Sequence, residues 1–137
     1  MRTRYSPLVK LKKSTMDKSE RVVQKANADL SSASIALELS YNSLDDIEAP
    51  ITGNMSDLLA SRSLLSSQRD LINNNKEWIS FAKKQLNSAK QQLKLDMVEY
   101  EKFKYLEFQE IKKMQYEIKI KESKELDEIA LLTYGKR

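Results

Sequence analysis

Residues 58–100, LLASRSLLSSQRDLINNNKEWISFAKKQLNSAKQQLKLDMVEY, carry an apolar or aromatic side chain at every seventh position. The members of this repeat are Leu58, Leu65, Ile72, Ile79, Leu86, Leu93 and Tyr100. Ala82 and Ala89 each follow a member by three residues, so they supply the alternating positions of a coiled-coil seam. A repeat of seven sustained over this length predicts a helix that packs lengthwise against another helix.

A first long helix is expected over about residues 7–48. Ser6 is suited to cap its start, and Pro7 occupies a first-turn position where proline is tolerated. Pro50 and Gly53 mark its end. The expected seam starts with Leu8, Thr15 and Val22. After a step of eight residues, bridged by Ala26, it resumes with Leu30, Leu37, Leu44 and Ile51. The alternate positions of this second stretch are Ala33, Ser40 and Ile47. Such an extra residue shifts the phase of a coiled coil.

A turn is expected at about residues 49–56, with Asn54 or Ser56 as the cap of a second helix over about residues 57–132. The run of asparagines at residues 73–75 favours a distortion or break, because Asn is a poor helix former, whereas the uninterrupted repeat favours a continuous helix. One short connection predicts antiparallel packing. After Tyr100 the stripe is expected to change phase at Glu107 and to continue through Phe108, Ile111, Met114, Ile118, Leu126, Ile129 and Leu132, up to Gly135.

The predicted fold is therefore all-α: a single coiled-coil domain over residues 1–137, built as a long antiparallel two-helix hairpin with unequal arms. The composition agrees with this fold, since the chain holds only two Gly and two Pro and is rich in helix formers.

The residue types exclude most catalytic chemistry. The chain contains no Cys and no His, so thiolate or imidazole catalysis and the corresponding metal sites are absent. Two glycines do not form a phosphate-binding loop, and adjacent acids such as Asp45 and Asp46 diverge on a helix. We therefore predict a protein that is not an enzyme, with no catalytic residues, no cofactor and no metal.

Charge and hydropathy bear on location and partners. No apolar run reaches the length of a membrane span, and Lys10, Lys12 and Lys13 interrupt any secretory signal, which predicts a cytoplasmic protein. Residues 1–25 carry eight basic side chains against two acidic ones. This basic end could contact nucleic acid, but acids interleave with bases over most of the chain and no nucleic-acid module is present. Protein partners, and no nucleic acid, are expected.

Two regions are candidates for partner contact. Tyr100, Phe103, Tyr105 and Phe108 do not all fit one seam, because Tyr105 points well away from Tyr100 and Phe103 at about 100° per residue. They either shield the seam or form an exposed aromatic partner surface. Near the C-terminus, residues 126–134 are apolar on more than one face, and Leu126, Ile129 and Leu132 or Leu131 form a stripe. This stripe either packs against Leu8 and Leu11 or serves as a docking element.

Both ends of the chain resemble the FliJ family of flagellar type III export proteins. The resemblance rests on YSPLVKLKK at residues 5–13 and on ESKELDEIA at residues 122–130. Length, charge, the lack of Cys and the two-helix pattern agree over essentially the whole chain, whereas residues 50–75 carry no family signature.

The resemblance implies a stalk, similar to that of rotary ATP synthases, which binds and stimulates the ring of the flagellar export ATPase. It also implies contacts with the export gate membrane protein and with export chaperones, at the inner membrane of the flagellar base. The paired termini would enter the ring, with Leu8, Leu11, Lys12, Leu126, Ile129 and Leu132 as contacts. The alternative is a general coiled-coil adaptor or chaperone, including the equivalent stalk of a virulence secretion system. An unpaired C-terminal half would also permit self-association.

Overall fold

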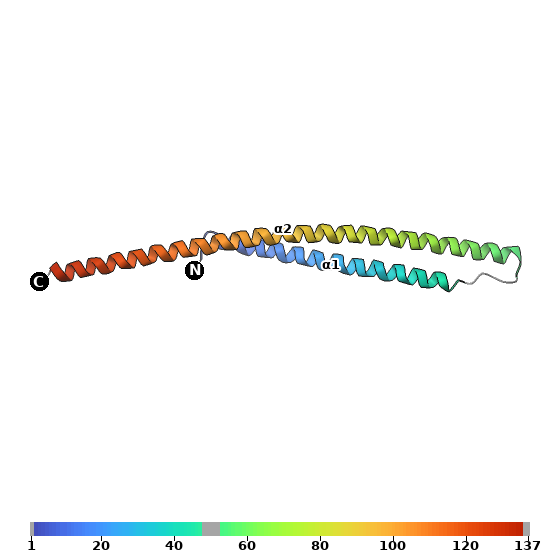
Figure 1. The fold of residues 1–137 in the computed structure, drawn as a ribbon, viewed down its shortest axis with the longest axis horizontal. Coiled ribbons are helices and arrows are strands. Elements are labelled where there is room, and N and C mark those ends of the chain that lie inside the picture. Colours follow the sequence, from blue (N-terminus) through green and yellow to red (C-terminus); the bar gives the residue numbers. More distant parts are fainter. Residues whose placement is uncertain (1, 48–52, 136–137) are drawn as a thin grey trace. The chain divides into compact units, whose positions relative to one another are not determined.

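The computed structural model describes residues 2–47 and 53–135 and forms two helices (Figure 1). α1 spans Ser6–Asp45, with 40 residues, and α2 spans Met55–Gly135, with 81 residues. No strand occurs in the described part of the chain. The prediction of an all-α helical hairpin with unequal arms is confirmed. α2 continues through residues 73–75 without a break, and the expected seam residue Ile51 lies outside the described residues.

The chain divides into two compact units, each of which is described by itself. The middle unit comprises Lys18–Lys94, and the terminal unit comprises Met1–Asp17 together with Leu95–Arg137. At the start of α2, in the middle unit, the Asn54 side-chain oxygen accepts a hydrogen bond of 3.0 Å from the Asp57 N–H. Asn54 therefore caps α2, which is one of the two predicted choices.

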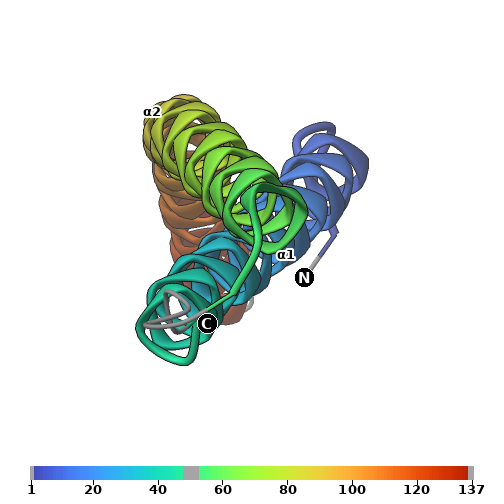
Figure 2. The ribbon, with the colours of Figure 1, turned by 90° about the vertical axis from the view of Figure 1, so that its right-hand side faces the viewer.

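Small side chains line the core of the middle unit. The buried residues of α1 occur at every seventh position and are Ser19, Ala26, Ala33 and Ser40. Those of α2 are Ile72, Ala82, Leu86 and Ala89. Ala33 is 0% exposed, and Ala26 forms a cluster with Leu86 and Ala89 that Val23 and Leu30 flank. The predicted seam positions of Ala33, Ser40, Ala82 and Ala89 are confirmed, and side chains of this size allow close helix packing. Figure 2 views the two helices from the end at which α2 begins.

A layer of hydrogen bonds crosses the middle unit. The Asn75 amide donates to the Ser40 hydroxyl and to the Ala36 carbonyl, at 3.2 Å from the latter. The Ser40 hydroxyl donates in turn to the Ala36 carbonyl at 2.7 Å, and the Gln68 amide donates to the Ser40 carbonyl at 2.8 Å. Gln68 of α2 bonds to Ser40 of α1, whereas the later residue Asn75 bonds to the earlier residue Ala36, so the two helices are antiparallel. A polar residue at a seam position specifies the register, since other registers leave it without partners.

Replacing Asn75 by alanine is expected to lower the free energy of unfolding by about 1 kcal/mol, because two hydrogen bonds between the helices are lost. The matched control is Asn74→Ala, at an exposed position of the same helix, where the better helix propensity of alanine acts alone. Urea unfolding followed by circular dichroism measures both variants. Equal stability of the two variants would show that the hydrogen bonds of Asn75 contribute nothing.

The seam of α1 differs from the expectation in its first part. The expected Leu8, Thr15 and Val22 are exposed, Val22 at 57%. The half-buried positions instead follow one constant step of seven, at Val9, Met16, Val23, Leu30, Leu37 and Leu44. No extra residue shifts the phase. Each expected residue has an apolar neighbour one position later, and a constant step keeps the helix against its partner without local unwinding.

The repeat of α2 also continues beyond Tyr100, so the expected change of phase at Glu107 is wrong. Glu107 and Met114 are half-buried at the next two steps of seven, whereas Phe108 is 52% exposed. Glu110 is half-buried as well. Acidic residues therefore occupy the seam near the basic start of α1, and the carboxylate of Glu110 lies near the guanidinium of Arg4 there.

Candidate partner-binding surfaces

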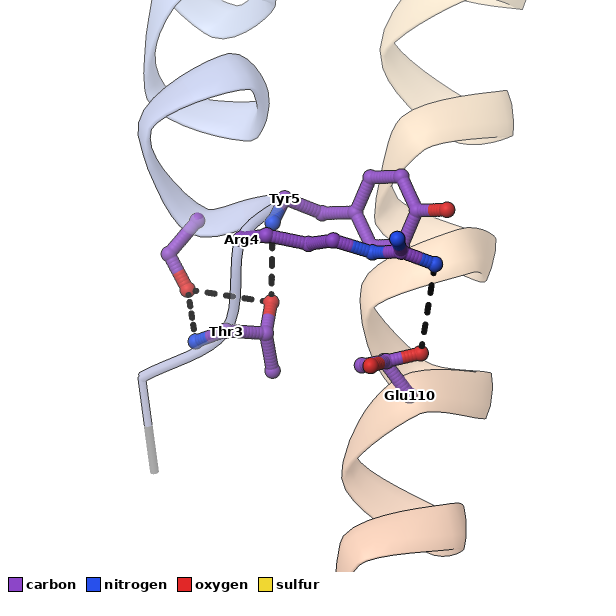
Figure 3. Close-up of polar contacts among 5 residues, drawn as sticks. Thr3, Arg4, Tyr5 and Glu110 are labelled. Carbon is purple, nitrogen blue, oxygen red and sulfur yellow. Dashed lines mark hydrogen bonds and ion pairs between the residues drawn. The ribbon is translucent and has the colours of Figure 1, made fainter.

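The start of α1 is held by hydrogen bonds around Thr3, which is 8% exposed (Figure 3). The Thr3 N–H donates to the Ser6 hydroxyl at 2.9 Å, and the Tyr5 N–H donates to the Thr3 hydroxyl at 3.1 Å. The Ser6 N–H donates to the Thr3 carbonyl at 3.1 Å. Ser6, expected as the cap, is the first helical residue, and its hydroxyl bonds back to Thr3 as in a capping box.

An ion pair places this start beside α2 within the terminal unit. Arg4 Nη2 lies 3.9 Å from Glu110 Oε2, and the Arg4 guanidinium lies 5.0 Å from the centre of the Tyr5 ring (Figure 3). The pair is solvent-accessible on the Arg4 side, so its contribution to stability is small. The Arg4–Glu110 pair shows that the start of α1 lies beside the turn of α2 that contains Glu110.

Lys12 has partners inside the terminal unit. Its ammonium lies 3.6 Å from Glu99 Oε2 and 5.4 Å from the centre of the Phe103 ring. The side chain is 32% exposed. Of the three α1 residues expected to contact the ATPase, Lys12 thus joins the two helices, while Leu8 and Leu11 are exposed at 38% and 59%.

The aromatic group divides into two pairs. Tyr100 and Phe103 are half-buried at seam positions, whereas Tyr105 and Phe108 are 62% and 52% exposed. The prediction that Tyr105 points away from the seam is confirmed. The Lys112 ammonium lies 5.0 Å from the centre of the Phe108 ring and leaves the ring accessible. We call Tyr105 and Phe108 the outer aromatic pair.

Every residue of α2 from 115 to 135 is exposed, and we call these residues the C-terminal segment. α1 begins beside Glu110, so no described residue of α1 covers the segment. Leu126, Ile129 and Leu132, the C-terminal stripe, are 66%, 59% and 67% exposed. Of the two alternatives for this stripe, packing against Leu8 and Leu11 does not occur.

The six expected ATPase contacts therefore form two groups. Leu8, Leu11 and Lys12 lie on α1, which begins beside Glu110, whereas the C-terminal stripe begins at Leu126, about 24 Å further along α2 at 1.5 Å per residue. Tyr116, Leu131 and Tyr134 are exposed on the opposite side of the C-terminal segment. Leu131 and Tyr134 belong to the run whose sequence is apolar on more than one face, whereas Tyr116 was not predicted as an exposed residue.

The described helices carry no span that could cross a membrane. Within residues 2–47 and 53–135, no group of three or more potential ligand side chains is placed to hold a metal ion.

Two unequal antiparallel helices with a small-residue seam and an uncovered C-terminal segment define an all-α coiled-coil hairpin protein. The family model described as "Flagellar FliJ protein" matches residues 1–137, the whole chain. The chain belongs to the FliJ family and is a component of flagellar type III protein export. No curated protein and no solved structure matches it.

Proposed function

We propose that this chain binds and stimulates the flagellar export ATPase through the C-terminal segment. The observation that supports the proposal is a single helix, exposed on all sides from residue 115 to residue 135, that displays the apolar C-terminal stripe. An exposed apolar stripe on a soluble surface is typical of a binding site. A single helix is about 10–12 Å across, which suits insertion into the centre of a ring.

The outer aromatic pair provides a second surface for the export gate protein or an export chaperone. Phe108 and Leu126 are separated by about 27 Å along α2, so two partners can be bound at the same time. Exposed aromatic side chains supply much of the energy at protein interfaces. On this proposal the protein links the ATPase to the gate on the cytoplasmic side of the inner membrane, at the flagellar base.

We also propose that the chain acts without chemistry of its own. It contains neither Cys nor His, and its charged side chains are distributed along helix surfaces. A hairpin with one exposed helical end acts on its partner through binding contacts alone, and the ATPase carries out ATP hydrolysis.

A chain truncated after Met114 is expected to lose stimulation of the purified flagellar export ATPase, because the C-terminal segment is removed. The truncated hairpin should keep the melting temperature of the full chain, since residues 115–135 have no packing partner in the hairpin. The matched control is Ile35→Ser with Leu39→Ser, at two exposed apolar positions of α1, which should stimulate normally. Full stimulation by the truncated chain would exclude the C-terminal segment as the ATPase contact.

A further inference from the structure

One flank of α2 in the middle unit carries a basic side chain at every seventh position. These side chains, which we call the basic row, are Arg62, Arg69, Lys76, Lys83 and Lys90. All five are exposed, and the row extends about 42 Å along the helix. Each residue follows a seam position by four, so the row has the same period as the seam. It therefore stays on one flank of the hairpin and does not wind around it.

On α2, no acidic residue lies one turn further along the flank of the basic row, and the two acids that follow its members in sequence, Asp70 and Glu77, are turned about 100° away from it. The residues four positions after its first four members, one turn further along the same flank, are the uncharged Ser66, Asn73, Ser80 and Asn87. None of the five basic side chains forms an ion pair with a described residue. The row is thus a strip of positive charge that forms no ion pair with the described residues.

The facing positions of α1 are almost uncharged. By their heptad position they are Asn27, Ser34 and Tyr41, with Glu20 as the one acid. The Lys76 ammonium lies 5.8 Å from the centre of the Tyr41 ring, which shows that the two flanks are adjacent. The other flank of α2 carries the uncharged Leu64, Leu71 and Trp78 at its corresponding positions, so the two flanks of α2 differ in charge there.

Exposed apolar residues stand at one end of the row. Met55, one repeat before Arg62, is 70% exposed, and Leu59, three residues before Arg62, is 58% exposed. Both lie on the flank of the basic row by their spacing. The flank thus combines apolar side chains at its start with basic side chains along its length.

We propose that this flank binds the surface of a bilayer containing anionic phospholipids. Met55 and Leu59 enter the interface between headgroups and acyl chains, and the basic row lies along the phosphate and carboxylate headgroups. Stable membrane attachment needs two such signals, and the flank supplies both. A fluid anionic surface meets neighbouring basic residues of the row without requiring the matched spacing of acids that a protein partner would need. This surface is separate from the C-terminal segment and independent of ATPase binding.

The test uses the full chain and vesicles of phosphatidylcholine with about one-third phosphatidylserine, sedimented at moderate salt. Each basic residue near such a surface contributes about fivefold to partitioning, so Arg69→Gln, Lys76→Gln and Lys83→Gln together are expected to reduce binding about a hundredfold. The matched control is Lys18→Gln, Arg21→Gln and Lys25→Gln, which removes the same charge from exposed positions of α1 in the same unit. The control should reduce binding less than fivefold.

A second variant, Met55→Ser with Leu59→Ser, should also weaken binding to anionic vesicles without changing any charge. All substituted residues are exposed, so the circular dichroism spectra of the variants should match that of the original chain. Three results would overturn the proposal: equal losses in the two triple variants, equal binding to pure phosphatidylcholine vesicles, or binding to polyglutamate without binding to anionic vesicles. The last result would assign the basic row to an acidic protein.

Discussion

Substituting Ala33 by aspartate is expected to lower the free energy of unfolding by about 3–5 kcal/mol, because an unpaired carboxylate would be placed in a fully enclosed seam position. Ala33 is 0% exposed and lies between two helices whose core contains few large side chains. The seam there has no room for the carboxylate to turn into water. Thermal unfolding followed by circular dichroism at 222 nm measures the change.

The matched control for this variant is Ala28→Asp, an exposed position of α1 five residues earlier. Both substitutions reduce helix propensity by about 0.7 kcal/mol or less, so their difference reports burial alone. The control should melt close to the original chain. If both variants lost the same stability, the close approach of the helices at Ala33 would be wrong.

Replacing Leu126, Ile129 and Leu132 together by serine is expected to weaken binding to the flagellar export ATPase about a thousandfold. Each apolar side chain contributes about 1.5 kcal/mol when an interface buries it, and about 4 kcal/mol corresponds to three powers of ten in Kd. The hairpin should remain folded, since all three residues are exposed. Isothermal titration with the purified ATPase measures the affinity, and phosphate release measures the stimulation.

The control for this variant lies on the opposite side of the same segment. Tyr116→Ser, Leu131→Ser and Tyr134→Ser remove a comparable amount of exposed apolar surface from the same stretch of helix. ATPase binding should change by less than tenfold. An equal loss of binding in both triple variants would mean that the partner contacts all sides of the helix or recognises the helical backbone. The C-terminal stripe would then have no special role.

The hairpin and the seam of α2 from Leu65 to Tyr100 could be predicted because one signal dominated them, whereas Leu58, the first member of the predicted repeat, is 40% exposed. The repeat from Leu58 to Tyr100 needs no knowledge of the partner helix, and Pro50 with Gly53 left only one connection. The first part of the α1 seam could not be predicted in the same way. In the pairs Leu8–Val9 and Val22–Val23 both residues are apolar, so two phases fit equally well. The residues that would distinguish the two phases, Lys12 and Ser19, are not apolar, so they gave no hydrophobic signal.

The candidate site was predicted only in part. The excess length of the second helix indicated an unpaired end, and the exposed C-terminal segment agrees with that expectation. The seam role of Glu107 and Glu110 was missed, because a carboxylate is recognised as a seam residue only when its partner is known. The partner of Glu110, Arg4, lies more than a hundred residues away in the sequence.

The polar layer at Ser40 also determines how the hairpin responds to a force along its helices. If α1 slid by one repeat, about 10 Å, Asn75 would meet Ala33 in place of Ser40 and would lose its hydroxyl partner. The next serine on the same line, Ser19, is three repeats away, a displacement of about 30 Å. Intermediate positions therefore offer no equivalent bonds. In the middle unit, the polar layer therefore opposes sliding of one helix along the other, and a force applied along one helix is transmitted to the other through this layer.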